Sequence, residues 1–352
     1  MKYSRNSKRF LSINSIIILL EERSDIELVN IKKILFFGLG SIGTRHLKLL
    51  KKNYDFDIYA YRSKKGNSIN GIVNIYKLEE ALHVNPDIVF ITNPTHLHIK
   101  TAISCLKAGI KNLFIEKPLS NTLDDLDIFL RETERLGALV YIGYNMRYSP
   151  ILIRLKNLVK ERENSIFYAE TLCSSFLPSW RSERDYREVY SSKKEQGGGV
   201  ILDLSHEFDY NEWLFGKIKS IDGVYGKISK LDINSEDMCD VIVRFENKMV
   251  AKIHLNYFGH KDERLVKIFT PSEEIIADLI NKEIIIINEQ GKKIETFSFE
   301  LDYLYEQQQK YFFDGVETQS KEISNLKDAK ELLVKLLDFK KNNKMIMTSK
   351  II

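Results

Sequence analysis

The sequence predicts an α/β protein in two parts: a parallel sheet with helices comes first, and an α+β part with a large, mainly antiparallel open sheet follows. Between residues 31 and 142, strands of buried type alternate with amphipathic helices, as in βαβ units. Beyond Pro150, strand-like runs follow one another with short gaps. At 352 residues the chain is also too long for one ordinary core, so we expect two domains.

Composition narrows the class of protein. Hydrophobic residues make up 43% and charged residues 29%, which are the values of a globular chain. The net charge is only +4, so we expect neither nucleic acid nor a membrane as a partner. Cys105, Cys173 and Cys239 have no metal or disulfide spacing, which fits a reducing cytosol and predicts a cytoplasmic protein.

Residues 1–30 are expected to form an N-terminal extension. A basic start, "MKYSRNSKRF", and a partly apolar run, "LSINSIIILL", together mimic a secretory signal. The run is short, is interrupted by polar residues and is followed by no small-residue cleavage site, so we favour an extension. No segment approaches the ~18–20 apolar residues of a membrane span.

The elements of the first part follow in order. Residues 34–37 form an apolar, β-favouring run, and residues 44–52 continue with helical periodicity. Further strands are expected over 57–62, 86–92 and 111–118, with a helix over 96–109. We expect the domain border within residues 144–150, so the first domain spans 31–148 and the second spans 149–352.

The second part is dominated by strand patterns. Two amphipathic helices are expected at its end, over 301–317 and 326–344. The strand-like runs cover residues 165–176, 221–229, 240–247, 249–259, 264–271, 273–280 and 283–289. Their short gaps favour antiparallel pairing.

Three glycines predict a dinucleotide site at the first strand–helix turn. Gly38, Gly40 and Gly43 have G-x-G-x-x-G spacing between a predicted strand and a predicted helix. Gly38 allows the tight turn, Gly40 the approach of pyrophosphate, and Gly43 close packing of the helix. The helix N-terminus at Ser41 and Ile42 attracts phosphate. We therefore predict a Rossmann dinucleotide-binding domain; the alternative is that the glycines serve only the turn.

The residues after the second strand favour NADP(H), with NAD(H) as the alternative. An acidic residue there would bind the ribose 2′-hydroxyl of NAD. The segment "YRSKK" instead carries Arg62, Ser63, Lys64 and Lys65. A guanidinium suits a 2′-phosphate, so we expect Arg62 and Ser63 to hold it. The alternative is that these are solvated loop residues.

Polar groups follow two more strands, at the sheet edge where ligands bind open α/β folds. Lys117 in this position can hydrogen-bond a substrate hydroxyl and serve in acid–base chemistry, although a lone lysine is more often a surface residue. The residues expected to contact the cofactor here are Thr92, Asn93, Pro94, His96, Glu116 and Lys117.

A run of three glycines leads into "VILDLSHEFDYNEWLFG", which carries Asp203, His206, Glu207 and Asp209. These fit metal ligands, a proton relay or the polar side of an amphipathic helix. No third metal ligand is evident, so we expect no metal. A spacing of three or four residues puts two groups on one helical face, so we expect Asp203 and His206 to face the same way.

In their order, "GLGSIG", "TNPTHLH", "EKP", "GYNMRYSP" and "GGGVILDLSHEFD" closely resemble the Gfo/Idh/MocA family of oxidoreductases, over roughly residues 31–215. The resemblance implies reversible hydride transfer at a sugar or cyclitol carbon without a metal. It implies that Lys117 is the catalytic lysine, that the Lys117–Pro118 bond is often cis, and that Asp203 and His206 complete the site. It also implies a homodimer or homotetramer formed through the C-terminal sheet.

One departure from the family pattern concerns the proton acceptor. The commoner pattern places a His four positions after the Asp, whereas His206 stands three after Asp203 and Glu207 stands at the fourth. We favour His206, whose ordinary pKa lies near operating pH, with Glu207 as the alternative. Asp203 is expected to hold or orient a substrate hydroxyl, and Asp209 to cap a helix or pair with a cation.

The segment before the glycines favours an anionic sugar as substrate. Arginines beside aromatics suit a carboxylate or phosphate on a sugar ring, although a solvated loop fits equally well. The residues are Trp180, Arg181, Arg184, Tyr186, Arg187 and Tyr190. The segment is similar to family members of surface-glycan metabolism, which implies a nucleotide sugar or an acidic sugar. By the family pattern Asn145 contacts substrate or nicotinamide, and Arg147 either contacts substrate or ties the domains together.

The predicted function is therefore an NAD(P)-dependent dehydrogenase or reductase that acts on a CH–OH group of a small-molecule sugar. One alternative is a non-catalytic NAD(P)-binding sensor of the same fold. Another is an epimerase-like or lyase-like enzyme that recycles its cofactor. The presence of Lys117, Asp203 and His206 favours an enzyme, because a sensor has no need of proton chemistry.

Overall fold

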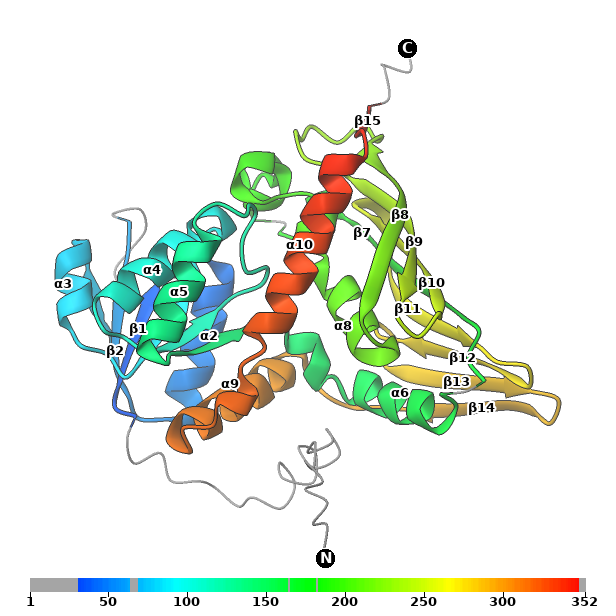
Figure 1. The fold of residues 1–352 in the computed structure, drawn as a ribbon, viewed down its shortest axis with the longest axis horizontal. Coiled ribbons are helices and arrows are strands. Elements are labelled where there is room, and N and C mark those ends of the chain that lie inside the picture. The colour runs from blue at the N-terminus through cyan, green and yellow to red at the C-terminus, as the bar shows by residue number, and fades with distance from the viewer. Residues whose placement is uncertain (1–30, 64–68, 164, 182, 348–352) are drawn as a thin grey trace, which may run out of the picture.

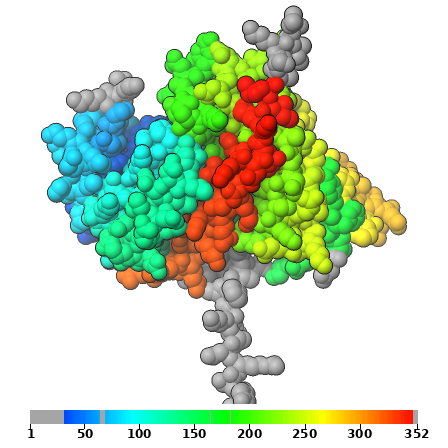
Figure 2. Space-filling model, turned by 45° about the horizontal axis from the view of Figure 1, so that its top comes forward, coloured from blue at the N-terminus to red at the C-terminus, as the bar shows by residue number. Residues whose placement is uncertain are grey.

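A computed structural model describes residues 31–63, 69–163, 165–181 and 183–347. The predicted extension over residues 1–30 lies outside the described residues, and so do Lys64 and Lys65. The described chain forms two halves side by side, each built on one sheet. Helix α10 (Leu326–Asn342) lies in the seam between them (Figures 1 and 2). Within the described ranges, no helix is long and apolar enough to cross a membrane.

The first half confirms the predicted Rossmann-type sheet. In the described part of the chain it has six parallel strands in the order β3-β2-β1-β4-β5-β6. The order reverses between β1 and β4, and this reversal opens a crevice at the carboxyl ends of the strands. The elements are β1 (Lys33–Phe37), α2 (Ser41–Asn53), β2 (Asp57–Tyr61), β3 (Val73–Ile75), α3 (Leu78–His83), β4 (Ile88–Ile91), α4 (His98–Lys107), β5 (Asn112–Ile115), α5 (Leu126–Leu136) and β6 (Leu139–Ile142).

Helices cover both faces of this sheet, and one of them comes from near the end of the chain. Alternate strand residues face α4 and α5 on one side. On the other side Phe90 and Phe114 face α2 and α9 (Leu301–Glu317). Phe312 of α9 is fully buried, 5.6 Å from Phe114 between ring centroids. Helix α9, which the predicted border assigns to the second domain, therefore packs in the core of the first.

The second half confirms the large, mainly antiparallel sheet. As far as the chain is described, it has nine strands in the order β14-β13-β12-β11-β7-β10-β9-β8-β15, of which β7–β10 and β8–β15 pair in parallel. The helices lie on the face toward the first half (Figure 1). Its strands are β7 (Tyr168–Phe176), β8 (Ile218–Lys227), β9 (Met238–Phe245), β10 (Val250–Asn256), β11 (Phe258–Phe269), β12 (Glu273–Asp278), β13 (Glu283–Asn288), β14 (Gly291–Thr296) and β15 (Ile346–Met347).

Short helices connect the sheet to the crevice. Helix α6 (Pro150–Glu161) follows the first half, and the glycine run leads into α7 (Val200–Asp203) and α8 (Ser205–Phe215). The 3₁₀ turns are η1 (Thr95–Leu97), η2 (Asn145–Tyr148), η3 (Leu177–Ser179), η4 (Tyr186–Glu188), η5 (Tyr190–Ser192), η6 (Lys194–Gln196) and η7 (Lys321–Ile323). Four of these turns lie between residues 177 and 196, so the predicted substrate segment is a chain of turns.

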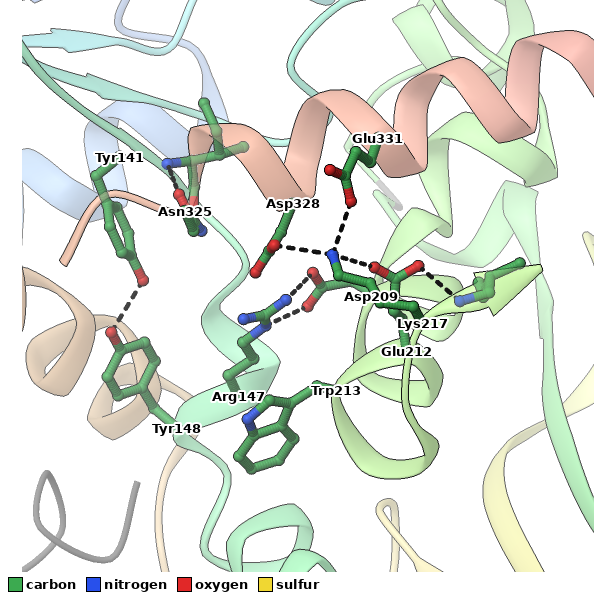
Figure 3. Close-up of polar contacts among 12 residues, drawn as sticks. Tyr141, Arg147, Tyr148, Asp209, Glu212, Trp213, Lys217, Asn325, Asp328 and Glu331 are labelled. Carbon is green, nitrogen blue, oxygen red and sulfur yellow. Dashed lines mark hydrogen bonds and ion pairs between the residues drawn. The ribbon is translucent and has the colours of Figure 1, made fainter. Parts of the chain in front are cut away.

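Polar side chains lock the halves together beside the seam (Figure 3). Arg147 of η2 donates two hydrogen bonds to Asp209 of α8, at 2.9 and 2.7 Å. Lys217 lies within 3.0 Å of three carboxylates, which belong to Glu212, Asp328 and Glu331. The side-chain amide of Asn325 makes two hydrogen bonds to the backbone of Ile142, which covers the edge of β6. These contacts hold η2, and with it Asn145, in a set position against α8.

Candidate active site

A cleft of about 1040 Å³ opens where β1, β4 and β5 end and extends to α8. Arg181 and the turns over residues 183–196 also line it. It brings together residues predicted from separate motifs: Gly38, Gly40, Ser41, Ile42, Arg62, Ser63, Thr92, Asn93, Pro94, Glu116, Lys117, Asn145, Arg181 and His206. The carboxyl ends of parallel strands meet at one edge of the sheet, so motifs far apart in the chain converge there.

Each of the three motif glycines is needed for a different structural reason. Gly38 has a φ of +93°, and a Cβ there would lie 2.8 Å from the Cα of Asn93. At Gly43 a Cβ would lie 2.4 Å from the carbonyl oxygen of Gly38, so this glycine permits close packing of α2 and lies behind the cleft. At Gly40 a Cβ would meet nothing within 4 Å, which leaves open space beside the backbone. Gly40 is therefore the place where a ligand can approach the chain.

The N-terminal turn of α2 suits the phosphates of a dinucleotide. No side chain caps the helix at Gly40, and the first turn contains no acidic residue. The N–H groups of such a turn have no partner within the helix, and the helix dipole attracts negative charge. Arg45 and Arg62 also line the cleft. These groups fit a dinucleotide with its pyrophosphate at α2.

Glu116 is fixed from beneath the cleft by His46. The His46 Nε2 atom lies 2.8 Å from Glu116 Oε1, and the amide nitrogen of Gln309 lies 2.8 Å from His46 Nδ1. Because that amide nitrogen can only donate, His46 accepts at Nδ1 and donates from Nε2 to Glu116. The second carboxylate oxygen of Glu116 accepts the backbone N–H of Lys117 at 3.2 Å. Helices α2 and α9 thus orient the Glu116–Lys117 pair.

Lys117 lines the cleft and contacts Asp203, which lies just outside the cleft lining. The Lys117 ammonium donates to the backbone carbonyl of Asp203 and lies 3.4 Å from its Oδ1 atom. The carboxylate also accepts the hydroxyls of Tyr190 and, at 3.0 Å, of Tyr257. Burial raises the pKa of Asp203, but the charge of Lys117 and these hydroxyls lower it more, so the pKa lies below its ordinary 3.8. Asp203 is therefore ionised at neutral pH. The Lys117–Pro118 peptide bond is cis, as the resemblance implied.

His206 reaches the cleft from the first turn of α8. Its ring lies edge-on to Tyr144 at 5.7 Å, and its Nδ1 atom is buried without a hydrogen-bond partner. Burial, together with the charges of Lys117 and Arg264, lowers the pKa of His206 well below 6.5. The imidazole is therefore neutral at pH 7 and has the protonation state of a base.

Glu207 does not reach the cleft. Its side chain is fully buried and lies 2.6 Å from Arg264 of β11, on the sheet side of α8. Nor do Asp203 and His206 share one continuous helix, as the spacing predicted. α7 ends at Asp203, Leu204 has φ −96° and ψ 31°, and α8 begins at Ser205. This break turns His206 toward the cleft and Glu207 toward the sheet. The sequence-based alternative that Glu207 contacts substrate is therefore corrected.

Four further predicted contacts lie outside the cleft. His96 is exposed on η1, and His98 at the start of α4 lines the cleft in its place. Arg147 pairs with Asp209, which confirms the predicted ion pair of Asp209 and the tying role of Arg147. Trp180 donates to Ser175 at 2.9 Å, and the Tyr186 hydroxyl accepts the backbone N–H of Asp232. The side chains of Arg147, Trp180 and Tyr186 thus already have protein partners.

Sequence reasoning missed several residues that line or support the cleft. His98 bonds the carbonyl oxygens of Pro118 and Asn93, each at 2.9 Å. Arg45 lies over the ring of Tyr305, and both line the cleft. For His98 the signal was present, since "THLH" offers two histidines and only the second begins a helix. Tyr257 and Tyr305 had no signal, because they lie in an ordinary strand pattern and an ordinary helix pattern.

Comparison with known proteins finds relatives among oxidoreductases. A family model described as "Oxidoreductase family, NAD-binding Rossmann fold" matches residues 32–144, and one described as "GFO/IDH/MocA C-terminal domain" matches residues 171–275. The chain is 27% identical over 276 residues to myo-inositol 2-dehydrogenase of Thermotoga maritima, covering 73% of this chain and 78% of that protein.

Two solved structures share the fold. One is a putative NADPH-dependent oxidoreductase from Desulfitobacterium hafniense, with a TM-score of 0.76, 15% identity, and coverage of 89% of this chain and 97% of that one. The other is a UDP-N-acetylglucosamine 3-dehydrogenase from Acidithiobacillus ferrooxidans, with a TM-score of 0.70, 16% identity, and coverage of 87% and 95%. At these identities the likeness is one of fold.

Proposed function

Because this chain belongs to the Gfo/Idh/MocA family of oxidoreductases, we propose that it transfers hydride between NADP(H) and a hydroxyl-bearing carbon of an anionic sugar. The anionic sugar is a nucleotide sugar or an acidic sugar. The observation that carries the proposal is the meeting of Lys117 and a neutral His206 in one cleft with the α2 phosphate site. Among the described residues, no group of three or more His, Cys, Asp or Glu side chains could hold a metal ion.

The roles of the residues follow from their chemistry. When bound, the nicotinamide accepts or supplies the hydride. In the oxidative direction Lys117 donates a hydrogen bond to the substrate oxygen. His206 takes the hydroxyl proton as the carbonyl forms and the hydrogen on carbon departs as hydride. In reverse, His206 returns the proton to the oxygen, and Lys117 stabilises the negative charge that develops there.

The preference for NADP(H) rests on the end of β2. Arg62 and Ser63 line the cleft directly after this strand. Arg62 also donates to Asn74 at 2.9 Å, which orients its guanidinium. We expect nicotinamide fluorescence titrations to give tighter binding of NADPH than of NADH, and Arg62→Ala to remove most of that difference. Equal affinities in the wild type would refute the preference and leave the dehydrogenase intact.

The anionic substrate is supported by Arg181 and Arg184. Both line the cleft, and neither has an acidic ion-pair partner among the residues that the structure describes. Arg187 is the matched control, because it pairs with Asp185 and lies outside the cleft lining. In a screen of nucleotide sugars and sugar acids, we expect Arg184→Ala to raise KM about tenfold or more and Arg187→Ala to change it little. The opposite ranking would contradict this substrate class.

Replacing Lys117 tests the chemistry. Lys117→Ala should abolish turnover while NADPH affinity stays within a few fold, because α2 holds most of the cofactor. Turnover that survives in Lys117→Ala would overturn the mechanism. NADPH binding without turnover of any sugar by the wild type would instead support the sensor.

We also propose a homodimer or homotetramer through the outer face of the second sheet. Ile287 of β13 is 39% exposed and Ile294 of β14 is 48% exposed. Neighbouring exposed apolar side chains on a sheet face favour burial against another protein surface. Light scattering during gel filtration measures the assembly, and Ile287→Lys should shift it toward the monomer. A monomeric wild type would contradict this proposal.

A further inference from the structure

Both carboxylate oxygens of Asp203 are held by protein donors, away from the cleft lining. The residue is buried, with 3% of its surface exposed. Oδ1 accepts the hydroxyl of Tyr190 and faces Lys117 at 3.4 Å, while Oδ2 accepts the hydroxyl of Tyr257 at 3.0 Å. The residue is also absent from the cleft lining. Its carboxylate therefore acts on substrate only through Lys117.

The two tyrosines that hold this carboxylate differ in their surroundings. Tyr257 lies between β10 and β11, is fully buried, and does not line the cleft. Tyr190 begins η5 in the chain of turns and lines the cleft. The Arg181 guanidinium lies over the Tyr190 ring, 5.9 Å from its centroid. Tyr190 thus links the segment that carries the substrate-facing arginines to the carboxylate that holds Lys117.

We propose that Tyr190 is a positioning residue that couples Arg181 and the turns over residues 183–196 to Lys117 through Asp203. The Tyr190 hydroxyl on Oδ1 takes up part of the carboxylate charge. The Lys117 ammonium therefore stays 3.4 Å from Oδ1 and remains able to reach a substrate in the cleft. Without that hydroxyl, Oδ1 is left to Lys117, and the ion pair closes and draws the ammonium from the substrate. The inference rests on the proposed function for its consequence in catalysis, but the coupling itself concerns this chain alone.

The first test needs no substrate. Trace acetylation by acetic anhydride across a pH series, read by mass spectrometry of the peptide that contains Lys117, reports how tightly its ammonium is held. We expect Tyr190→Phe to move the half-maximal labelling of Lys117 upward by about 0.5–1 pH unit. Asp203→Asn should move it downward, because the carboxylate charge is lost. Thermal melting and NADPH titration check that each variant is folded.

The second test separates coupling from simple support. Tyr257→Phe removes one hydroxyl from the same carboxylate, but from a position outside the cleft. With a sugar that the wild type turns over, we expect Tyr190→Phe to lower kcat about tenfold or more and also to raise KM. Tyr257→Phe should lower kcat with KM unchanged. An equal rise of KM in both variants would show that Tyr190 does not couple the segment.

The outcomes distinguish the two proposals. Unchanged Lys117 labelling in Tyr190→Phe overturns this inference, whether or not the wild type is active. Should that variant not fold, Asp203→Asn must still move the labelling downward, and its failure to do so overturns the inference as well. A labelling shift of the expected sign in a protein that oxidises no sugar supports the coupling and counts against the proposed function.

Discussion

Lys117 and His206 come from different halves of the chain, and the first is an ammonium cation whereas the second is neutral. Lys117 lies beside an ionised Asp203, which stabilises its ammonium. His206 is buried between the positive charges of Lys117 and Arg264, which oppose a second proton on its ring. The pair thus holds a hydrogen-bond donor and a proton acceptor at one pH, as transfer of a hydroxyl proton requires.

A pH dependence follows from His206. Oxidation requires the neutral imidazole, and burial lowers the pKa of His206 well below 6.5, so the acidic limb of the oxidative kcat profile should lie below pH 6.5. His206→Asn should remove this limb and lower kcat about 100-fold or more. Steady-state rates from pH 5 to 9 measure both. A limb at or above pH 6.5 would refute the assignment.

The same shift affects stability. The pKa of His206 is lower in the folded state than the 6.5 of an unperturbed histidine, so the unfolded chain binds the proton more tightly. The contribution of neutral His206 to stability is therefore complete above pH 6.5 and is lost as the pH falls below it. His206→Asn should make urea unfolding less sensitive to pH in that range. An unchanged pH dependence would contradict the shift.

At the scale of elements, a backbone break and a glycine run determine which way the side chains around α7 and α8 point. The break at Leu204 separates α7 from α8 and sends two neighbouring residues to different places. The glycines before α7 have an equally local reason. Gly199 has a φ of +105°, and a Cβ there would lie 2.3 Å from the carboxyl carbon of the buried Glu236. The glycine at this position therefore makes room for close packing against Glu236.

Two alanine substitutions in the first glycine motif should affect different properties: Gly43→Ala should lower stability, and Gly40→Ala should weaken NADPH binding. Gly43→Ala places a Cβ 2.4 Å from backbone, so it should cost about 1–3 kcal/mol of stability. Gly40→Ala meets nothing within 4 Å, so stability should change by less than about 1 kcal/mol. Its methyl enters the space proposed for pyrophosphate, and NADPH affinity should fall about tenfold or more. Urea unfolding and fluorescence titration measure the two effects. Wild-type NADPH binding by Gly40→Ala would contradict the proposed cofactor position.

At the scale of the whole molecule, a helix from near the end of the chain packs against the first sheet and contributes to the site. Helix α9 covers one face of the first sheet with Phe312, orients His46 through Gln309, and adds Tyr305 to the cleft. Helix α10 follows it through the seam (Figure 2). The two halves therefore share a core and a site, although each has its own sheet.

Shared packing predicts cooperative unfolding. Phe312→Ala leaves a cavity beside Phe114 and should lower the free energy of unfolding by about 3–5 kcal/mol. Leu301→Ala on the same helix is the control, because Leu301 is 48% exposed and should change stability by less than about 0.5 kcal/mol. Urea unfolding followed by circular dichroism should show one transition. Two separate transitions would mean that α9 does not join the halves.

Local patterns were sufficient for the fold class and the glycine turn, whereas the expectation that Lys117 and His206 share a site came from the family resemblance. Strand and helix periodicity is a property of neighbouring residues, and parallel strands bring their carboxyl ends together whatever lies between them. Local composition suggested a border at residues 144–150, but it could not show that α9, far along the chain, packs against the first sheet.

The sequence by itself therefore determined the architecture, the dinucleotide motif and the chemical groups of the site. Only the tertiary structure decided which partner each group has. Glu207 could be excluded from the cleft only because the structure shows its ion pair with Arg264, which is 57 positions away along the chain. Asp203 could not be separated from the substrate until the hydroxyls of Tyr190 and Tyr257 were seen to occupy it. The physical reason is that the charge and direction of a buried group depend on neighbours that are distant in sequence, and no local pattern encodes them.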